Sequence, residues 1–262
     1  AEKEGIETLK FCDAISKTFS DLSKTLNLTN TDFIRTTENR HLKSVQHLWN
    51  ELEKNDNIYL SKYSGWYSVS DEAFYTEDEI EEIDGKKIAT ISKSSVEWMD
   101  EESYFFRLSK WEKPLLDFYK KNPDFISPAS RRNEVISFVK SGLKDLSVSR
   151  KSFSWGIKVP NNNDHVIYVW LDALTNYISA LNYPNKDDKL FKNFWPATVH
   201  IIGKDILRFH AIYWPAFLLA ANIPLPLKVY GHGWILSGDE KMSKSKGNIL
   251  DPSEIIKKYG ID

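Results

Sequence analysis

A chain of 262 residues is long enough for one large domain or two smaller ones, each with its own hydrophobic core. Hydrophobic residues make up 41% and charged residues 27%, as in ordinary water-soluble proteins, and no apolar run approaches the length of a membrane span. The formal net charge of −2 provides no positive field for nucleic acid, so any RNA contact must be local. Cys12 is the single cysteine and no secretory leader pattern is visible, so we expect a reducing, cytoplasmic setting without a membrane partner.

Two helices are predicted at the start of the chain. In the first, apolar residues recur at intervals of three and four, at Phe11, Ile15, Phe19, Leu22 and Leu26. The second begins at residues 39–41, and its apolar face consists of Leu42, Val45, Leu48, Trp49 and Leu52.

The middle of the chain changes character twice. From Ile58 to about Trp98, short aromatic and β-branched runs alternate with acidic turns containing Asp84 and Gly85, which predicts a small, partly antiparallel insertion. Residues 101–143 are expected to return to helix, first before Pro123 and again over 133–140. These shifts divide the chain into residues 1–57, 58–143 and 144–262.

The last third alternates between strands and helices. Strands are predicted at 165–171, 198–203 and 227–231, and helices at 172–181 and 204–221, with a kink near Pro215. This order predicts an α/β fold with a parallel sheet and a ligand crevice at the carboxyl ends of its strands.

The predicted strand ends, residues 170–173, 203–205 and 231–234, combine small residues with an acid, a lysine or an imidazole. That composition suits the sugar and phosphates of a nucleotide, with Asp205 accepting from ribose hydroxyls and the amides of Gly203 or Gly233 facing the base or sugar. The alternative is that the glycines only permit tight turns.

A stripe follows Asp205, because Ile206, His210 and Trp214 lie four residues apart on one helical face. An apolar side chain, an imidazole and an indole would form a slot for a medium-sized apolar side chain with one weak acceptor. The alternative is a core histidine bonded to a neighbouring carbonyl.

Residues 241–248 contain three lysines in six residues, with serines and a glycine between and after them. Such a cationic loop suits a triphosphate, and Lys241 and Lys244 are the candidate catalytic residues because their charge would stabilise a leaving pyrophosphate. A generic lysine-rich surface loop is the alternative.

These segments together resemble one known family. The final loop, KMSKSKGN, resembles the second signature of class I aminoacyl-tRNA synthetases. With it, VWLDALTNY and HIIGKDILRFHAIYWPA resemble methionyl-tRNA synthetase, and the similarity extends upstream through DFIRTTENRH, GWYSVSDEAFY, SYFFRLSK and SRRNEVISFVKSGLKDLSVSR. The resemblance implies a fragment of a Rossmann-type catalytic region, with residues 58–143 as its connective insertion.

The resemblance also implies site residues. Those matching the family's methionine pocket are Trp170, Ala173, Leu174, Tyr177, Ile206, His210 and Trp214, with Tyr177 near the thioether sulfur. Those matching its ATP site are Gly203, Asp205, His232, Ile235, Lys241, Met242, Ser243, Lys244 and Ser245. Leu174 departs from the pattern, because many relatives have proline there.

The activity implied is that of a methionine–tRNA ligase in protein biosynthesis. ATP, with Mg²⁺, would react with methionine to form methionyl-adenylate, and tRNA(Met) would then receive the methionyl group. We find no His-Ile-Gly-His-like motif and no anticodon-binding domain, so this chain alone is expected to be inactive. Many relatives hold zinc in the insertion through CxxC pairs, but Ser68 and Asp71 occupy the first pair's positions, so we predict no zinc and no other resident metal.

Two alternatives remain open. Another class I synthetase could share the lysine loop, although the lining from Ile206 to Trp214 differs from a pocket for branched aliphatic side chains. A non-catalytic, synthetase-derived RNA-binding module would suit the missing motif, but it would not require Asp205, His210 and the lysine loop.

Overall fold

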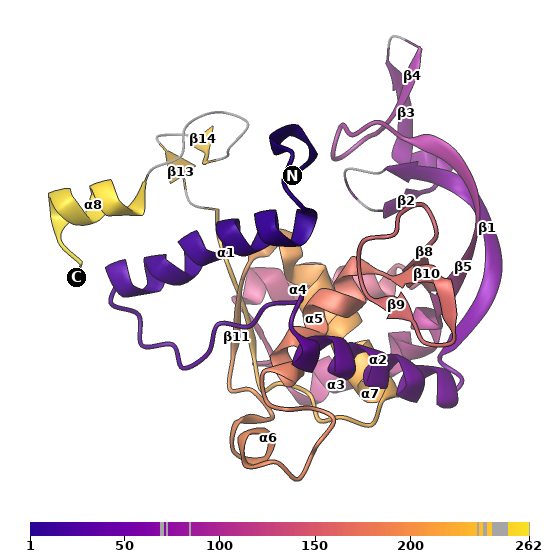
Figure 1. The fold of residues 1–262 in the computed structure, drawn as a ribbon. Coiled ribbons are helices and arrows are strands. Elements are labelled where there is room, and N and C mark those ends of the chain that lie inside the picture. Colours follow the sequence, from indigo (N-terminus) through magenta and orange to yellow (C-terminus); the bar gives the residue numbers. More distant parts are fainter. Residues whose placement is uncertain are drawn as a thin grey trace. The chain divides into compact units, whose positions relative to one another are not determined.

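The computed structural model describes residues 1–68, 71, 73–83, 85–234, 236–237, 240–242 and 251–261. The chain divides into two compact units, drawn together in Figure 1. The larger unit is Thr36–Gly231, and the smaller unit combines Ala1–Arg35 with His232–Asp262.

The smaller unit contains two α-helices in its described part, of which α1 (Thr8–Thr25) is the first predicted helix. A short 3-10 turn, η1 (Glu2–Glu4), precedes it, and Arg35 forms an ion pair of 2.6 Å with Asp13. The C-terminal part holds the antiparallel pair β13 (Leu236–Ser237) and β14 (Glu240–Lys241), then α8 (Pro252–Tyr259). Asp251 caps α8 by accepting from the Ser253 amide at 2.8 Å.

The larger unit opens with α2 (Asn39–Lys54), which begins at the predicted residue. Its apolar face is fully buried at Val45, Leu48, Trp49 and Leu52, whereas the outermost predicted residue, Leu42, remains exposed. The second predicted helix is therefore confirmed.

The antiparallel strands predicted from Ile58 to about Trp98 are also confirmed. Strand β1 (Ile58–Ser68) pairs with β5 (Glu97–Phe106) from Ile58–Phe106 to Tyr67–Glu97, and the sheet has the order β2-β1-β5-β7, with β2 at Ala73–Tyr75 and β7 at Leu146–Ser147. A hairpin, β3 (Ile80–Ile83) and β4 (Lys86–Ala89), turns at Gly85, whose φ of 75° favours glycine. Asp84 lies outside the described residues. A short 3-10 turn, η2 (Glu77–Glu79), precedes β3.

The prediction that helix resumes at residue 101 is wrong, because β5 continues to Phe106. Residues 101–106 carry no period of their own that separates strand from helix, and pairing with the long β1 decides their conformation. Helix follows in η3 (Leu108–Trp111), α3 (Glu112–Lys121) and α4 (Ala129–Lys140). Helix α4 begins four residues before the predicted start at 133.

A parallel pair is present between β12 (Val229–His232) and β6 (Ile126–Ser127), in a sheet of order β11-β12-β6 with β11 at His200–Gly203. Strands β11 and β12 lie where strands were predicted, whereas β6 was not predicted. The strand predicted at 165–171 is wrong in extent and partner. Strand β10 (Asn162–Ile167) ends at Ile167 and pairs antiparallel with β8 (Ser149–Arg150) and β9 (Lys158–Val159). The apolar run after it begins helix α5 (Val169–Ser179), because an unbroken apolar run does not distinguish a strand from a buried helix.

Residues 204–220 form an interrupted helix. A 3-10 turn, η4 (Lys204–Ile206), leads to a π-helical turn, η5 (Phe209–Tyr213), and then α7 (Trp214–Ala220). Pro215 has no N–H for the carbonyl of Ala211, four residues earlier, and Tyr119 on α3 supplies the missing donor at 2.5 Å. The irregularity thus lies at Phe209–Tyr213, before Trp214, whereas we predicted a kink near Pro215, just after the stripe.

The remaining helix is α6 (Lys189–Phe194), capped by Asp188, which accepts from the Leu190 amide at 2.8 Å. No helix in the described ranges combines the length and apolarity needed to span a bilayer.

Replacing Tyr119 with phenylalanine should destabilise the larger unit. Burial raises the pKa of the Tyr119 hydroxyl, so it remains a donor, and its removal leaves the buried Ala211 carbonyl without that partner. We expect a loss of about 1–3 kcal/mol in the free energy of unfolding, measured by urea denaturation. Tyr59→Phe is the control, because the Tyr59 hydroxyl donates to Asp145 at 2.8 Å in a partly exposed position. An equal loss in both variants would contradict the role of Tyr119.

Candidate functional site

The residues predicted for an apolar side-chain pocket come from two segments of the larger unit. Helix α5 carries Trp170, Ala173, Leu174 and Tyr177, and the interrupted helix carries Ile206, His210 and Trp214. Leu174, His210 and Trp214 are buried, and the others are partly buried. The two segments pack together, and ring contacts bring Trp170 and Tyr177 of α5 next to His210 and Trp214.

Hydrogen bonds fix the orientation of His210. Its Nδ1 lies 2.9 Å from the carbonyl oxygen of Ile206, and its Nε2 lies 2.8 Å from the hydroxyl of Tyr177. Because the carbonyl only accepts, Nδ1 carries the proton, and Nε2 accepts from Tyr177. His210 thus bonds to a neighbouring carbonyl, as the structural alternative expected, and it also contacts Tyr177; its role in a substrate pocket stays a prediction.

Burial keeps this hydrogen-bonded pair uncharged. It lowers the pKa of His210, against an opposing effect of the bond to Ile206, and it raises the pKa of Tyr177 to about 12. At neutral pH, a neutral imidazole and a neutral phenol therefore face each other.

Three aromatic members of the cluster were missed by the sequence analysis. Phe209 stacks on Trp170, with ring centroids 3.7 Å apart and planes at 10°. His200, on β11, lies 4.0 Å from the Tyr177 ring, and Trp195 lies 6.2 Å from both His200 and Trp214. The many aromatic residues within 195–214 could have indicated that Phe209 belongs to the cluster. The contacts of Trp195 and His200 depend on tertiary packing, which the sequence does not show.

Two polar atoms in this cluster are buried without a hydrogen-bond partner among the described residues, His200 Nε2 and Trp214 Nε1. Burial, with a smaller effect of His210, lowers the pKa of His200 from 6.5 to about 3. His200 is therefore neutral at physiological pH, and the cluster presents apolar and neutral polar surface.

The predicted nucleotide residues fall in both units. Gly203 ends β11 and Asp205 lies in the 3-10 turn that follows, where its side chain is exposed. His232 ends β12 and is exposed, with Nδ1 2.7 Å from the carbonyl oxygen of Gly233. At Gly231, on the same strand, a Cβ would make ordinary van der Waals contact with Leu207 Cδ1, 3.5 Å away.

The lysine loop is described only at its start. Lys241 ends β14, with Leu236 as its strand partner, and Met242 follows. Ile235, Ser243, Lys244 and Ser245 lie outside the described residues.

Asp71, at a position where relatives were expected to hold zinc, is the centre of a hydroxyl cluster. Its carboxylate accepts from Tyr75 at 2.7 Å, from Ser92 at 2.5 Å and from Ser94 at 2.8 Å, and its amide donates to Ser68 Oγ at 3.4 Å. Burial raises the pKa of Asp71, but these hydrogen bonds outweigh it and leave the pKa below the usual value. Within the described ranges, no group of three His, Cys, Asp or Glu residues could hold a metal ion.

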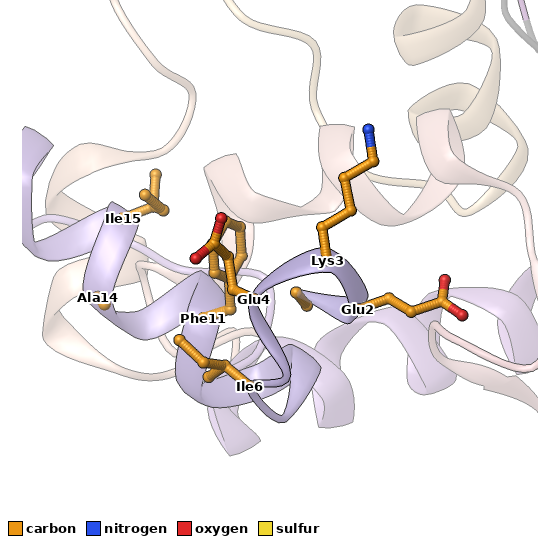
Figure 2. Close-up of a pocket in the computed structure, with 8 residues that line it drawn as sticks. Glu2, Lys3, Glu4, Ile6, Phe11, Ala14 and Ile15 are labelled. Atoms are coloured by element: carbon orange, nitrogen blue, oxygen red, sulfur yellow. The ribbon is translucent and has the colours of Figure 1, made fainter.

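An open pocket in the smaller unit contains none of the predicted site residues. Figure 2 shows its lining along η1 and α1, which is mostly apolar on the helix side: Ala1, Glu2, Lys3, Glu4, Ile6, Phe11, Ala14 and Ile15.

The fold and cluster define an α/β protein with a largely buried, uncharged aromatic cluster near the carboxyl end of strand β11. The family model described as tRNA synthetases class I (M) matches residues 1–86 and 82–262, and the chain belongs to that family. The family resemblance stated from the sequence is therefore confirmed.

Curated relatives agree with this assignment. The chain is 58% identical over 262 residues to a protein of Rickettsia prowazekii (strain Madrid E) named methionine–tRNA ligase, of which it covers 51%. It is 54% identical over 263 residues to the protein of that name from Brucella suis biovar 1, of which it covers 51%. The chain is 52% identical over 269 residues to the Listeria monocytogenes protein of the same name, and it covers 40% of that protein. The chain spans about half the length of most of these relatives, while matching along its own full length.

Solved structures show the same relation. Mycobacterium tuberculosis methionyl-tRNA synthetase bound by methionyl-adenylate matches all of this chain with a TM-score of 0.94 and 48% identity, and 51% of that chain is covered. The apo form matches 97% of this chain with a TM-score of 0.85 and 45% identity, and 49% of that chain is covered. The predicted α/β fold class is confirmed by this agreement.

The buried neutral His200 should make stability depend on pH. The folded state accommodates the neutral imidazole, so its contribution is fully present above the unfolded pKa of 6.5 and is lost as pH falls towards 3. Compared with His200→Gln, the unsubstituted protein should lose up to about 1.4 kcal/mol more per pH unit below pH 6. Urea denaturation at pH 7, 6, 5 and 4.5 measures the difference, and parallel curves would contradict it.

Proposed function

We propose that this chain provides the methionine- and ATP-binding region of a methionine–tRNA ligase. The observation that carries the proposal is the neutral Tyr177–His210 pair within an aromatic cluster. The cluster lies in a fold that matches, over the whole of this chain, 51% of a methionyl-adenylate-bound synthetase.

The cluster suits a thioether side chain. A charged or strongly polar side chain would lose its hydration there, whereas a flexible apolar side chain would gain dispersion contacts. Trp170, Tyr177 and Trp214 offer ring faces and edges, and sulfur interacts favourably with aromatic rings by about 0.3–1.5 kcal/mol. Since the Tyr177 hydroxyl donates to His210, its contact with sulfur would be one of van der Waals type.

The other predicted residues of the pocket would complete its walls. We propose that the small side chain of Ala173 leaves space for the ligand beside α5, while Leu174 and Ile206 supply aliphatic surface. Leu174 is buried and Ile206 is partly buried, and the Ile206 carbonyl also fixes the tautomer of His210.

We propose that ATP binds at the strand ends. Gly203 would let the adenosine approach the backbone, and Asp205 would accept from ribose hydroxyls; its exposure in the turn after β11 supports this role. His232 and Ile235 would contact the adenosine. Mg²⁺ would enter with ATP, and the predicted loop residues from Lys241 to Ser245 would surround the triphosphate.

The reaction requires no protein nucleophile. The methionine carboxylate would attack the α-phosphorus of ATP, forming a mixed anhydride, methionyl-adenylate, while the bond to pyrophosphate breaks. A terminal hydroxyl of tRNA(Met) would then attack the methionyl carbonyl and release AMP. Catalysis would come from in-line positioning and from Lys241 and Lys244, which would stabilise negative charge on pyrophosphate.

Two other functions are less well supported. A synthetase for a branched aliphatic amino acid would not need the buried hydrogen bond between Tyr177 and His210. A non-catalytic RNA-binding module would gain little from a net charge of −2. The curated names of the relatives also favour methionine.

His210→Ala should weaken methionine binding at least tenfold, about 1.4 kcal/mol, and should change ATP binding less than twofold. The imidazole orients Tyr177, and the substitution leaves a cavity beside it. Isothermal titration with methionine, ATP, leucine and isoleucine measures the effect. His47→Ala is the control, because His47 packs edge-on against Tyr183 outside this cluster. Trp214→Ala should act in the same direction, and equal losses for methionine and ATP would refute the assignment.

Lys244→Ala should slow adenylate formation by about 100-fold with little change in methionine affinity, because the lysine would act on charge that develops on pyrophosphate. Pyrophosphate exchange measures the rate. Lys246→Ala, in the same loop but outside the predicted site, is the matched control. An unchanged rate for Lys244→Ala would remove the proposed role of this residue.

A further inference from the structure

One histidine of helix α2, His41, forms hydrogen bonds with two residues of helix α5. His41 is fully buried, with Nε2 2.7 Å from Asp172 Oδ1 and Nδ1 2.8 Å from Ser179 Oγ. Asp172 and Ser179 lie two helical turns apart on α5. One imidazole from a distant part of the sequence therefore bridges most of the length of α5.

Both bonds of His41 form with a neutral ring protonated at Nε2 and also with a charged ring. A neutral ring protonated at Nε2 donates to Asp172 and accepts from Ser179. A charged ring donates to both residues, and the Ser179 hydroxyl then donates to the carbonyl of Asn176, 3.1 Å away. The bridge is thus a constant feature of the packing between α2 and α5.

The bridge lies opposite the proposed pocket. At about 100° per residue, Trp170, Ala173, Leu174 and Tyr177 cluster on one face of α5, and Asp172 and Ser179 lie on the other side. Rotation or sliding of α5 would break the bonds of His41. It would also move the Tyr177 hydroxyl relative to His210, at a contact of 2.8 Å.

The same residue types form the catalytic triad of hydrolases, but Ser179 is fully buried and cannot meet a substrate. The burial of Ser179 instead agrees with a structural role, in which His41 links helices α2 and α5.

We propose that His41 is a positioning residue for the amino-acid pocket: by bridging Asp172 and Ser179, it fixes the rotation of α5 and so the position of Tyr177 against His210. This inference rests on the proposed function, because it assigns to His41 a role in methionine selection.

The test compares His41→Leu and His41→Gln in the complete polypeptide with the same changes at His165. His165 is also fully buried and contacts Ser149 at 2.9 Å, but it lies on β10. Urea denaturation gives stability, and titration gives affinities for methionine, leucine and ATP. His41→Leu should weaken methionine binding at least tenfold and reduce the discrimination against leucine. Its effect on ATP affinity should be less than twofold. His41→Gln should recover part of the loss, and the His165 variants should lose stability with methionine affinity within twofold.

Ser179→Ala removes one of the two bonds with little change in volume, and it serves if His41→Leu does not fold. Ser179→Ala should weaken methionine binding about threefold. If the unsubstituted protein binds methionine and both His41→Gln and Ser179→Ala bind it equally well, the inference on His41 is overturned and the proposed function stands. If the unsubstituted protein binds no methionine, the proposed function fails and takes this inference with it.

Discussion

The hydrogen bond from Tyr177 to His210 joins two segments that would otherwise meet only through apolar surface. Its direction follows from the Ile206 carbonyl, which requires a proton on Nδ1 of His210. Burial disfavours charge on both partners, so the bond is formed between neutral groups. A buried polar pair of this kind specifies one relative position of the two segments, because any other leaves polar atoms unpaired. The surrounding aromatic rings depend on that position.

The irregular helix that carries His210 depends on a second buried hydroxyl. Pro215 removes one backbone donor, and the π-helical turn at Phe209–Tyr213 changes the angular spacing of the residues before it. Tyr119 satisfies the Ala211 carbonyl from α3. The proline therefore does not break the element, since a neighbouring helix compensates for it. Phe209 can then stack on Trp170 while His210, the next residue, points towards Tyr177.

The sequence was informative where one element buries one face. Helix α2 was predicted to its first residue because Val45, Leu48, Trp49 and Leu52 repeat at helical spacing. It was misleading at residues 101–106, whose conformation depends on pairing with the distant strand β1. It was also misleading at residues 168–171, whose apolar run suits either a strand or a helix. The same limit applies to the site: Tyr177 and His210 could be selected by spacing and resemblance, but the contact of His200 with Tyr177 requires packing of β11 against α5.

Asp71 shows how a carboxylate can organise a small antiparallel region through hydroxyl groups. Tyr75 follows it closely, while Ser92 and Ser94 come from beyond the β3–β4 hairpin, so the cluster ties together segments about twenty residues apart. Each hydroxyl donates to an ionised acceptor, and such bonds are stronger than those between neutral groups. The same bonds outweigh burial and lower the pKa of Asp71, so their stabilisation is present above its unfolded pKa and is lost as pH falls through the folded value. His200 also loses its contribution on acidification, but over a higher pH range, because its unfolded pKa is 6.5. On acidification, the packing around His200 should therefore weaken before the hydroxyl cluster around Asp71 does.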